Sequence, residues 1–515
     1  MEKRQIVNIV NFVRALEPRH PEVDLLGTVK KQAELMQKHG LRGTFLFQYD
    51  VLIEPTFMEF FKSLDPQQFE FGVWHEVVEA QCAACGIEWH GRWAWDFHTH
   101  CGFPVGYTKE QRERLIDVLY EKFRELFGYY PRVFGSWLFD SHTVRYLTDT
   151  YGADALCNCK EQFGTDGYTL WGGYYGQAYY PRRSNVFLPA LGEGERIDAP
   201  LFRMLGSDQV YQYDYRVDPN RTEARIQGVI TLEPAILGSG GDLPEWVDWY
   251  MKENYNGECL SFGYAQAGQE NPFGWERIGH GLTYQCEQFE KLQREGKLTV
   301  EPMGETGRWF KETFCDTPAS AITAHTAYDD AEKNSVWYCT KYYRINLFGD
   351  HGDFRIRDIH LFTADYPDVY DEIVCTENHA TYEALPFIEG MRSTGCGIVG
   401  GGYITYKDGT APRHTDMVFT DDGDGKATVT YGELTIKLYE NGVIITAPKP
   451  FTLENRIGLF GDHLPECTAC TKDRIHLSYG GVRYAVRLAE GTATNENTLT
   501  ADGGVLHLVF DDCRA

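Results

Sequence analysis

Asp140 stands in the stretch GSWLFDSHTVRYL, residues 135–147, where an apolar strand-like run meets the predicted start of a helix. Trp137 lies three residues before it and His142 two residues after it. A carboxylate with aromatic and basic neighbours can serve as a nucleophile or, when protonated, as a general acid. Asp is also a favoured helix N-cap residue. The stretch therefore predicts either a catalytic carboxylate or a structural cap.

Polar and aromatic side chains follow the ends of other predicted strands too, and the carboxylates Glu76 and Glu270 among them are further candidate catalytic groups. Aromatic faces stack on sugar rings and polar groups recognise sugar hydroxyls, so this mixture is typical of a carbohydrate site. The alternative is that the rings only fill their loops. The candidate substrate-binding residues are Arg14, Glu17, Trp74, Asp96, His98, Trp137, His142, Asp166, Trp171, Tyr174, Asp208, Tyr211 and Trp275.

Some of these candidates have a structural interpretation that the sequence leaves open. Glu17 either binds substrate or pairs with Arg19, and Asp96 and His98 either bind substrate or order their own loop. His75 is predicted to be a buried histidine beside the core.

The elements that must position these residues alternate between strands and helices over the first three hundred residues. IVNIVNFV, residues 6–13, is a continuous apolar run, as expected for a strand covered on both faces. Such alternation predicts an irregular parallel (β/α) barrel of seven or eight strands over residues 1–315, with its active site at the carboxyl ends of the strands. The predicted strands are 6–13, 43–52, 69–78, 132–139, 153–160, 202–214, 259–269 and 298–310, and the predicted helices are 25–39, 109–127, 142–151 and one around 282–292.

The pattern changes to a period of two after about residue 320. Residues 426–446 alternate apolar and polar side chains, and Asn441-Gly442 is a strong hairpin signal. We therefore expect a sandwich-like antiparallel β domain over residues 316–515. No long Gly/Ser/Pro linker separates it from the barrel, so it is expected to pack against it.

Composition limits the partners. The 515 residues carry a formal net charge of −26, which disfavours nucleic acid and anionic membranes as partners. The apolar run near the start is interrupted by Asn8, Asn11 and Arg14, which favours a strand over a signal peptide and predicts a cytoplasmic protein. The 14 cysteines include two CxxC pairs, which are expected to be reduced thiols, with zinc binding as the alternative. Whether the chain forms a homo-oligomer stays open.

Several stretches resemble the glycoside hydrolase/deacetylase superfamily, notably FGVWHEVV, FGYYPRVFGSWLFDSHTVRYL and GTDGYTLWGGYYGQAYYPRRSN. The resemblance spans roughly residues 5–310 and implies an irregular, often seven-stranded β/α barrel. Metal-dependent deacetylases of the superfamily carry an Asp pair after the first strand and two histidines after the third. This chain has Asn11 and Arg14 at the first place, and His75 followed by Glu79 at the second. No metal or cofactor is therefore expected.

SWLFDSH and QENPFGWE resemble the strand-end motifs of family 57 glycoside hydrolases. That resemblance implies Asp140 as the nucleophile and Glu270 as the general acid/base, beside Trp137 and Trp275, with Glu76 as the rival for either role. The sequence thus predicts a retaining, metal-independent glycoside hydrolase acting on a small glycoside or oligosaccharide. The alternatives are a deacetylase, which is a carbohydrate esterase, and a catalytically inactive carbohydrate-binding protein.

Overall fold

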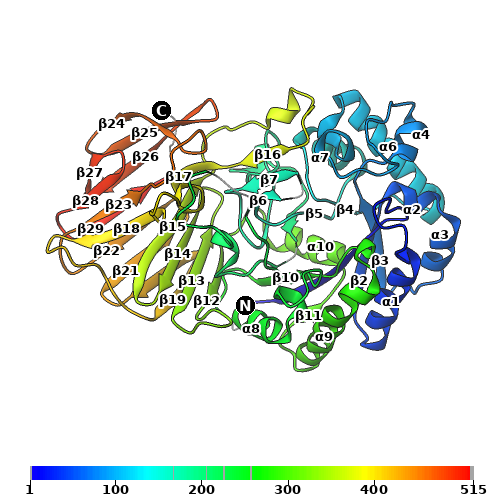
Figure 1. Ribbon diagram of the computed structural model, residues 1–515, viewed down its shortest axis with the longest axis horizontal. Helices are drawn as coiled ribbons and strands as arrows, with labels where there is room; N and C mark the ends of the chain where they lie inside the picture. Colours follow the sequence, from blue (N-terminus) through cyan, green and yellow to red (C-terminus); the bar gives the residue numbers. More distant parts are fainter. Residues whose placement is uncertain (1–2, 166, 205, 224–226, 256–257, 511–515) are drawn as a thin grey trace.

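The fold is described from a computed structural model that covers residues 3–165, 167–204, 206–223, 227–255 and 258–510. Figure 1 shows two parts side by side: an α/β part coloured blue to green, and a part built almost entirely of strands, coloured green to red. Within the described residues, no helix is both long enough and apolar enough to cross a membrane.

The α/β part is built around a curled sheet of seven parallel strands, which confirms the predicted irregular β/α barrel. Among the described residues no pairing joins β9 to β10, so the barrel is open at that point. Two short strands extend the sheet: β11 (Thr299–Val300) pairs with β1, and β8 (Ala178–Tyr179) runs antiparallel to β9. In spatial order the seven strands are β10 (Gly263–Ala267), β1 (Gln5–Val13), β2 (Gly43–Phe47), β3 (Phe69–Trp74), β4 (Val133–Ser136), β5 (Ala155–Asn158) and β9 (Leu201–Arg203).

Helices cover the outside of this sheet, and local sequence signals explain where they begin and end. In α6 the Thr108 side chain and Gln111 form a capping box, and Gly128 ends the helix in the left-handed conformation with φ 83°. The helices are α1 (Leu25–Lys38), α2 (Tyr49–Ile53), α3 (Pro55–Lys62), α4 (Glu79–Cys85), α5 (Thr99–Gly102), α6 (Lys109–Phe127), α7 (Ser141–Tyr151), α8 (Pro244–Asn254), α9 (Trp275–Arg294) and α10 (Met303–Thr313).

The strand-rich part contains two antiparallel sheets, as predicted. The hairpin signal at Asn441-Gly442 is confirmed, because β21 and β22 pair with each other from Tyr439 and Gly442 onward. One sheet contains β12 (Ser320–Ala324), β13 (Lys333–Cys339), β14 (Tyr343–Asp350), β15 (Asp353–Leu361), β17 (Leu385–Glu389), β18 (Gly401–Tyr406), β23 (Phe451–Arg456), β27 (Thr492–Asn495) and β28 (Thr498–Ala501). The other contains β19 (Met417–Gly423), β20 (Lys426–Tyr431), β21 (Leu434–Tyr439), β22 (Gly442–Thr446), β24 (Glu466–Cys470), β25 (Arg474–Tyr479), β26 (Val482–Glu490) and β29 (Val505–Val509).

A small third sheet ties the two parts together. Strands β6 (Gln162–Thr165) and β7 (Tyr168–Trp171) leave the barrel after β5, and β16 (Ala380–Glu383) from the strand-rich part pairs with β7 in parallel. Trp337, Phe362 and Met391 belong to the same buried cluster as the barrel core. The expected packing of the two parts is therefore seen, while the division at residues 315 and 316 stays a prediction.

Most predicted strands are shorter than expected, and three of them differ most. Residues 49–53 form α2 rather than extending β2, and β9 ends at Arg203 rather than near residue 214. The stretch 298–310 contains only the two-residue strand β11 before α10 begins at Met303. Most apolar residues of these stretches are buried, although Ile53 is 44% exposed, and a short apolar run does not distinguish a strand from a buried helical turn.

Candidate active site

A cavity with a volume of about 700 Å³ lies at the carboxyl ends of the barrel strands. We call it the main cavity. Its size lies within the range of small-molecule sites, about 300–1,000 Å³. Residues after β1, β3, β5 and β10 line it, together with the loop before α5 and the segment around β6 and β7. Of the predicted site residues it brings together Arg14, Glu17, Glu76, Trp137 and Glu270.

Arg14 organises the polar wall of the main cavity. Its Nη2 lies 2.5 Å from Glu270 Oε2, its Nε 3.0 Å from Glu76 Oε2, and its Nη1 3.6 Å from Glu17 Oε2. Burial lowers the pKa of the guanidinium, but the three carboxylates outweigh burial and raise it above its ordinary value. One buried cation thus holds three carboxylates at the edge of the cavity.

The order of strands explains this arrangement. Arg14 follows β1, which lies between β10 and β2 in the sheet. Glu270 follows the end of β10, and Glu76 follows the end of β3, which pairs with β2. Asn271 fixes the Glu270 loop to the end of β1, because its Oδ1 accepts from the Arg14 N–H at 2.9 Å and its Nδ2 donates to the Arg14 carbonyl at 2.8 Å. Strand ends that are distant in sequence therefore meet at one rim.

Glu17 and Glu76 have further partners. Arg19 Nε and Nη2 donate to Glu17 Oε1 and Oε2, each at 2.9 Å, so the predicted pairing of these residues exists inside the cavity wall. Burial raises the pKa of Glu17, but Arg19 and Arg14 outweigh it and lower the pKa below its ordinary value. The Trp74 indole N–H donates to Glu76 Oε2 at 2.9 Å. Trp74 is fully buried and serves as a support for Glu76.

Aromatic rings form much of the remaining wall. Trp95 lies under two guanidinium groups, with Arg14 at 4.0 Å and Arg19 at 4.8 Å from its ring centroid. Trp137 packs edge-on against Trp74, with ring centroids 5.0 Å apart, and lines the cavity. Phe97, Phe103 and Tyr168 also line the cavity. The loop 88–107 therefore contributes to the wall.

Asp140 lies outside the described lining of the main cavity. It is 1% exposed and is the N-cap of α7, where Oδ1 accepts from the Thr143 N–H at 2.9 Å. Arg112 from α6 contacts the same oxygen at 2.9 Å. The structure therefore does not bring Asp140 and Glu270 together at the cavity, and the cap interpretation accounts for Asp140.

Other predicted polar residues also stabilise their own segments. Asp96 accepts from Arg92 and from the His98 N–H and pairs with His98, so the loop-ordering alternative describes them. Asp208 accepts from Val210, Tyr211 and Trp246, and burial raises its pKa to about 6. His142 on α7 contacts Glu113 on α6 at 3.0 Å.

Most of the predicted aromatic site residues also contact other parts of the protein rather than the main cavity. Trp171 is fully buried and donates to Glu389 in the strand-rich part at 2.8 Å, and Tyr174 donates to the Pro318 carbonyl at 2.7 Å. Both side chains pack at the junction of the two parts, so replacing either by Ala is expected to affect folding as well as any binding. Tyr211 donates to Asp329 at 2.6 Å. Trp275 begins α9 beside the cavity-lining Phe273, and Asp166 lies outside the described residues.

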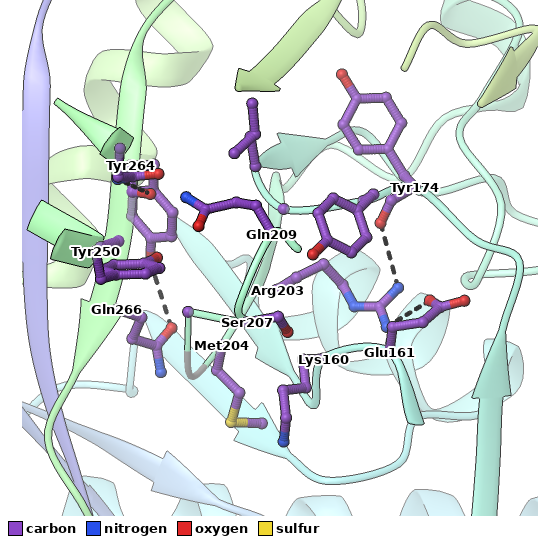
Figure 2. A pocket seen from close by; sticks show the side chains of 16 residues that line it. Lys160, Glu161, Tyr174, Arg203, Met204, Ser207, Gln209, Tyr250, Tyr264 and Gln266 are labelled. Atoms are coloured by element: carbon purple, nitrogen blue, oxygen red, sulfur yellow. Dashed lines mark hydrogen bonds and ion pairs between the residues drawn. The ribbon is translucent and has the colours of Figure 1, made fainter. Parts of the chain in front are cut away.

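Lys160, a polar residue that follows β5, is a further cavity residue. It lines the main cavity and also a smaller cavity of about 20 Å³ in the gap between β9 and β10. We call the latter the inner cavity; Figure 2 shows its lining, with Arg203 and Glu161 on one side and Tyr250, Tyr264 and Gln266 on the other. Position after β5 was the available signal for Lys160, but no motif marked it.

The donor set expected of a metal-dependent deacetylase does not fit a divalent cation here. Asn11 at the end of β1 accepts from Gln32 and from the Gln269 N–H, so it is a structural tie. His75 is 1% exposed, and burial lowers its pKa to about 4. Over the described ranges, no group of three or more His, Cys, Asp and Glu side chains is placed to hold a metal ion.

No protein family profile and no curated protein matches the chain. Among solved structures, a Parabacteroides distasonis protein classed as a glycoside hydrolase/deacetylase aligns with a TM-score of 0.58 and 14% identity, over 76% of this chain and 92% of that protein. A Mycobacterium smegmatis protein classed as a polysaccharide deacetylase aligns with a TM-score of 0.36 and 14% identity, over 61% of this chain and 92% of that protein. A 4-alpha-glucanotransferase of Thermococcus litoralis aligns with a TM-score of 0.32 and 9% identity, over 99% of this chain and 97% of that protein.

Only the first of these scores is high enough to support an argument, and at 14% identity that argument concerns the fold alone. The chain therefore has a glycoside hydrolase/deacetylase-like fold.

Proposed function

We propose that the chain hydrolyses the glycosidic bond of a small glycoside or oligosaccharide bound in the main cavity. The observation that carries this proposal is the placement of Glu76 and Glu270 on one guanidinium, that of Arg14, in the cavity wall. The shared guanidinium makes the two carboxylates neighbours in the cavity wall, and glycosidases work through such a pair of carboxyl groups. The aromatic walls supply stacking surfaces for sugar rings.

Glu76 is proposed as the nucleophile. Both of its protein donors, Arg14 Nε and the Trp74 indole, contact Oε2, which leaves Oε1 for the anomeric carbon as far as the described residues show. Its side chain is 2% exposed, so its orientation is set by packing and by these two donors. Attack forms a bond between Glu76 and the anomeric carbon while the bond to the leaving oxygen breaks.

Glu270 is proposed as the general acid and then the general base. Its side chain is 10% exposed, against 2% for Glu17 and Glu76. When fully ionised, the group of Arg14, Arg19 and these three carboxylates carries one surplus negative charge, which a single proton would neutralise. The proposed proton on Glu270 passes to the leaving oxygen, and Glu270 later takes a proton from the water that releases the sugar.

This assignment differs from the family 57-like one, in which Asp140 was the nucleophile. Arg112 and the α7 N-terminus already engage Asp140, and Glu76 faces the cavity. Deacetylation is the weaker proposal, since Asn11 and Arg14 stand where the metal-binding carboxylates of deacetylases would be.

The test is a screen of nitrophenyl glycosides and acetylated sugars with the purified full-length chain, with and without chelator. We expect glycoside turnover that chelator does not change, and losses of about 10²–10⁴-fold in Glu76→Gln and Glu270→Gln. Azide should partly rescue Glu76→Ala and give a glycosyl azide. If the chain instead releases acetate, loses that activity with chelator and turns over no glycoside, the hydrolase proposal is wrong and the deacetylase proposal takes its place.

A further inference from the structure

Lys160 is a buried cation with no partner among the residues that the structure describes. It is 4% exposed, and the described residues supply no hydrogen bond or ion pair to its side chain. An unpaired charge removed from water is costly, so buried ammonium groups are normally matched by an anion. The side chain lies between the main cavity and the inner cavity, since it lines both.

The carboxylate next to it in sequence is already engaged. Glu161 lies 2.7 Å from Arg344 Nη1 and 3.6 Å from Arg203 Nη2, and the Gly172 N–H also donates to it. In Figure 2 the Lys160 side chain extends away from Glu161 and Arg203, toward Met204. Glu161 therefore serves the two arginines, and the Lys160 ammonium points elsewhere.

The inner cavity does not supply the anion either. Its volume of about 20 Å³ suits about one water molecule, which needs roughly 10–15 Å³. Gln209, Gln266 and Tyr175 line it with buried polar atoms that have no hydrogen-bond partner among the described residues, so water there would be well bound. A group as large as a carboxylate can reach Lys160 only from the main cavity.

The carboxylates of the main cavity have other partners. Glu17 pairs with Arg19, Glu76 and Glu270 pair with Arg14, and Glu233 accepts from the Gln269 amide at 2.8 Å. Arg14 and Arg19 carry two positive charges against these four carboxylates, and Arg14 contacts three of them directly, which reduces their repulsion of a further anion beside Lys160. Lys160 is thus left to interact with whatever the cavity binds.

We propose that the substrate carries a carboxylate on its sugar ring, as a uronic acid does, and that Lys160 binds this carboxylate. The inference rests on the proposed function, because it names the substrate class of the same cavity. One ammonium matches the single charge of a carboxylate, whereas a phosphate ester carries about −1.5 to −2 and usually needs several donors.

The test measures binding rather than turnover, by calorimetry or ligand-observed NMR, with the full-length chain. The probes are glucuronate and galacturonate, the matching neutral sugars glucose and galactose, glucose 6-phosphate, and glucosamine. A charge-assisted contact in a closed cavity should favour each uronate over its neutral partner by about tenfold or more. Lys160→Met should reduce that ratio to about one, and Lys160→Arg should keep most of it.

Lys449→Met is the matched control, since Lys449 lies on the strand-rich part, 41% exposed and paired with Asp408. Thermal unfolding of each variant shows whether a loss of binding reflects a loss of folding, and Lys160→Arg keeps the test valid if Lys160→Met does not fold. Neutral sugars, glucosamine or glucose 6-phosphate binding as tightly as the uronates would overturn the inference. Failure of the hydrolase proposal can be told apart from failure of this inference. In the first case no glycoside is turned over, while the ratio of uronate to neutral-sugar affinity still depends on Lys160.

Discussion

At the scale of single residues, Asp50 is a buried acid whose charge should make stability depend on pH. Its side chain accepts from the Ala15 N–H at 2.8 Å and the Val51 N–H at 2.9 Å, yet burial outweighs these bonds and raises its pKa from 3.8 to about 7. Between these two pH values the folded chain binds more protons than the unfolded chain. The contribution of Asp50 to stability is therefore full below about pH 4 and is lost as the pH rises through 7.

Asp50→Asn removes this titration while keeping an oxygen for the backbone donors. We expect the free energy of unfolding of the variant, minus that of the unsubstituted chain, to increase steadily from about pH 4 to about pH 8. Urea unfolding at several pH values measures this difference. The exposed Asp65 supplies the control Asp65→Asn, which should show no such trend. A flat difference for Asp50→Asn would mean that Asp50 is ionised throughout.

At the scale of elements, the start of α7 depends on two acids. Asp140 caps Thr143, while Asp368 from the strand-rich part accepts from the Ser141 N–H at 2.8 Å. Burial, together with the nearby charge of Asp140, raises the pKa of Asp368 to about 6. Arg112 joins α6 to this point by contacting Asp140 and donating to the Tyr370 carbonyl. The turn that carries Asp140 is thus a junction between three segments.

Asp140→Ala should destabilise the fold by roughly 3–5 kcal/mol, because it leaves Arg112 buried and uncompensated. Asp140→Asn keeps the cap acceptor and should cost less. Turnover per folded molecule should stay within a few-fold in both variants, as measured by active-fraction kinetics next to circular dichroism. A well-folded Asp140→Asn with turnover as low as Glu270→Gln would restore Asp140 as the nucleophile.

At the scale of the whole molecule, buried charges join the barrel to the strand-rich part. Arg344 on β14 is fully buried and contacts Glu161 after β5 at 2.7 Å and Asp358 on β15 at 2.6 Å. Glu389 on β17 accepts from Trp171 at 2.8 Å and contacts Arg392 at 3.2 Å. With the pairing of β7 and β16, these contacts predict that the two parts unfold together.

Arg344→Met should lower the free energy of unfolding by roughly 3–5 kcal/mol, because Glu161 and Asp358 lose their shared cation. Arg413→Met is the matched control at the exposed pair with Asp353, where a change within about 0.5 kcal/mol is expected. Urea unfolding followed by both fluorescence and circular dichroism should give coincident transitions. Equal stability of the two variants would show that this network does not couple the parts.

Local pattern was sufficient for much of this architecture. The apolar run of β1, the capping residues of α6 and the hairpin at Asn441-Gly442 depend on neighbours close in sequence, so they could be predicted. The rule that barrel sites gather at strand ends also selected Arg14, Glu76 and Glu270.

The roles of these residues depended on contacts between segments far apart in the chain. Arg14 meets Glu270 across more than two hundred residues, and no local pattern encodes that ion pair. Asp140 and Trp171 had the composition of site residues, but Arg112 and Glu389 engage them in the interior. Burial and pairing are set by packing of the whole chain, so only the tertiary structure distinguished a cap from a catalytic acid and left Lys160 facing the cavity.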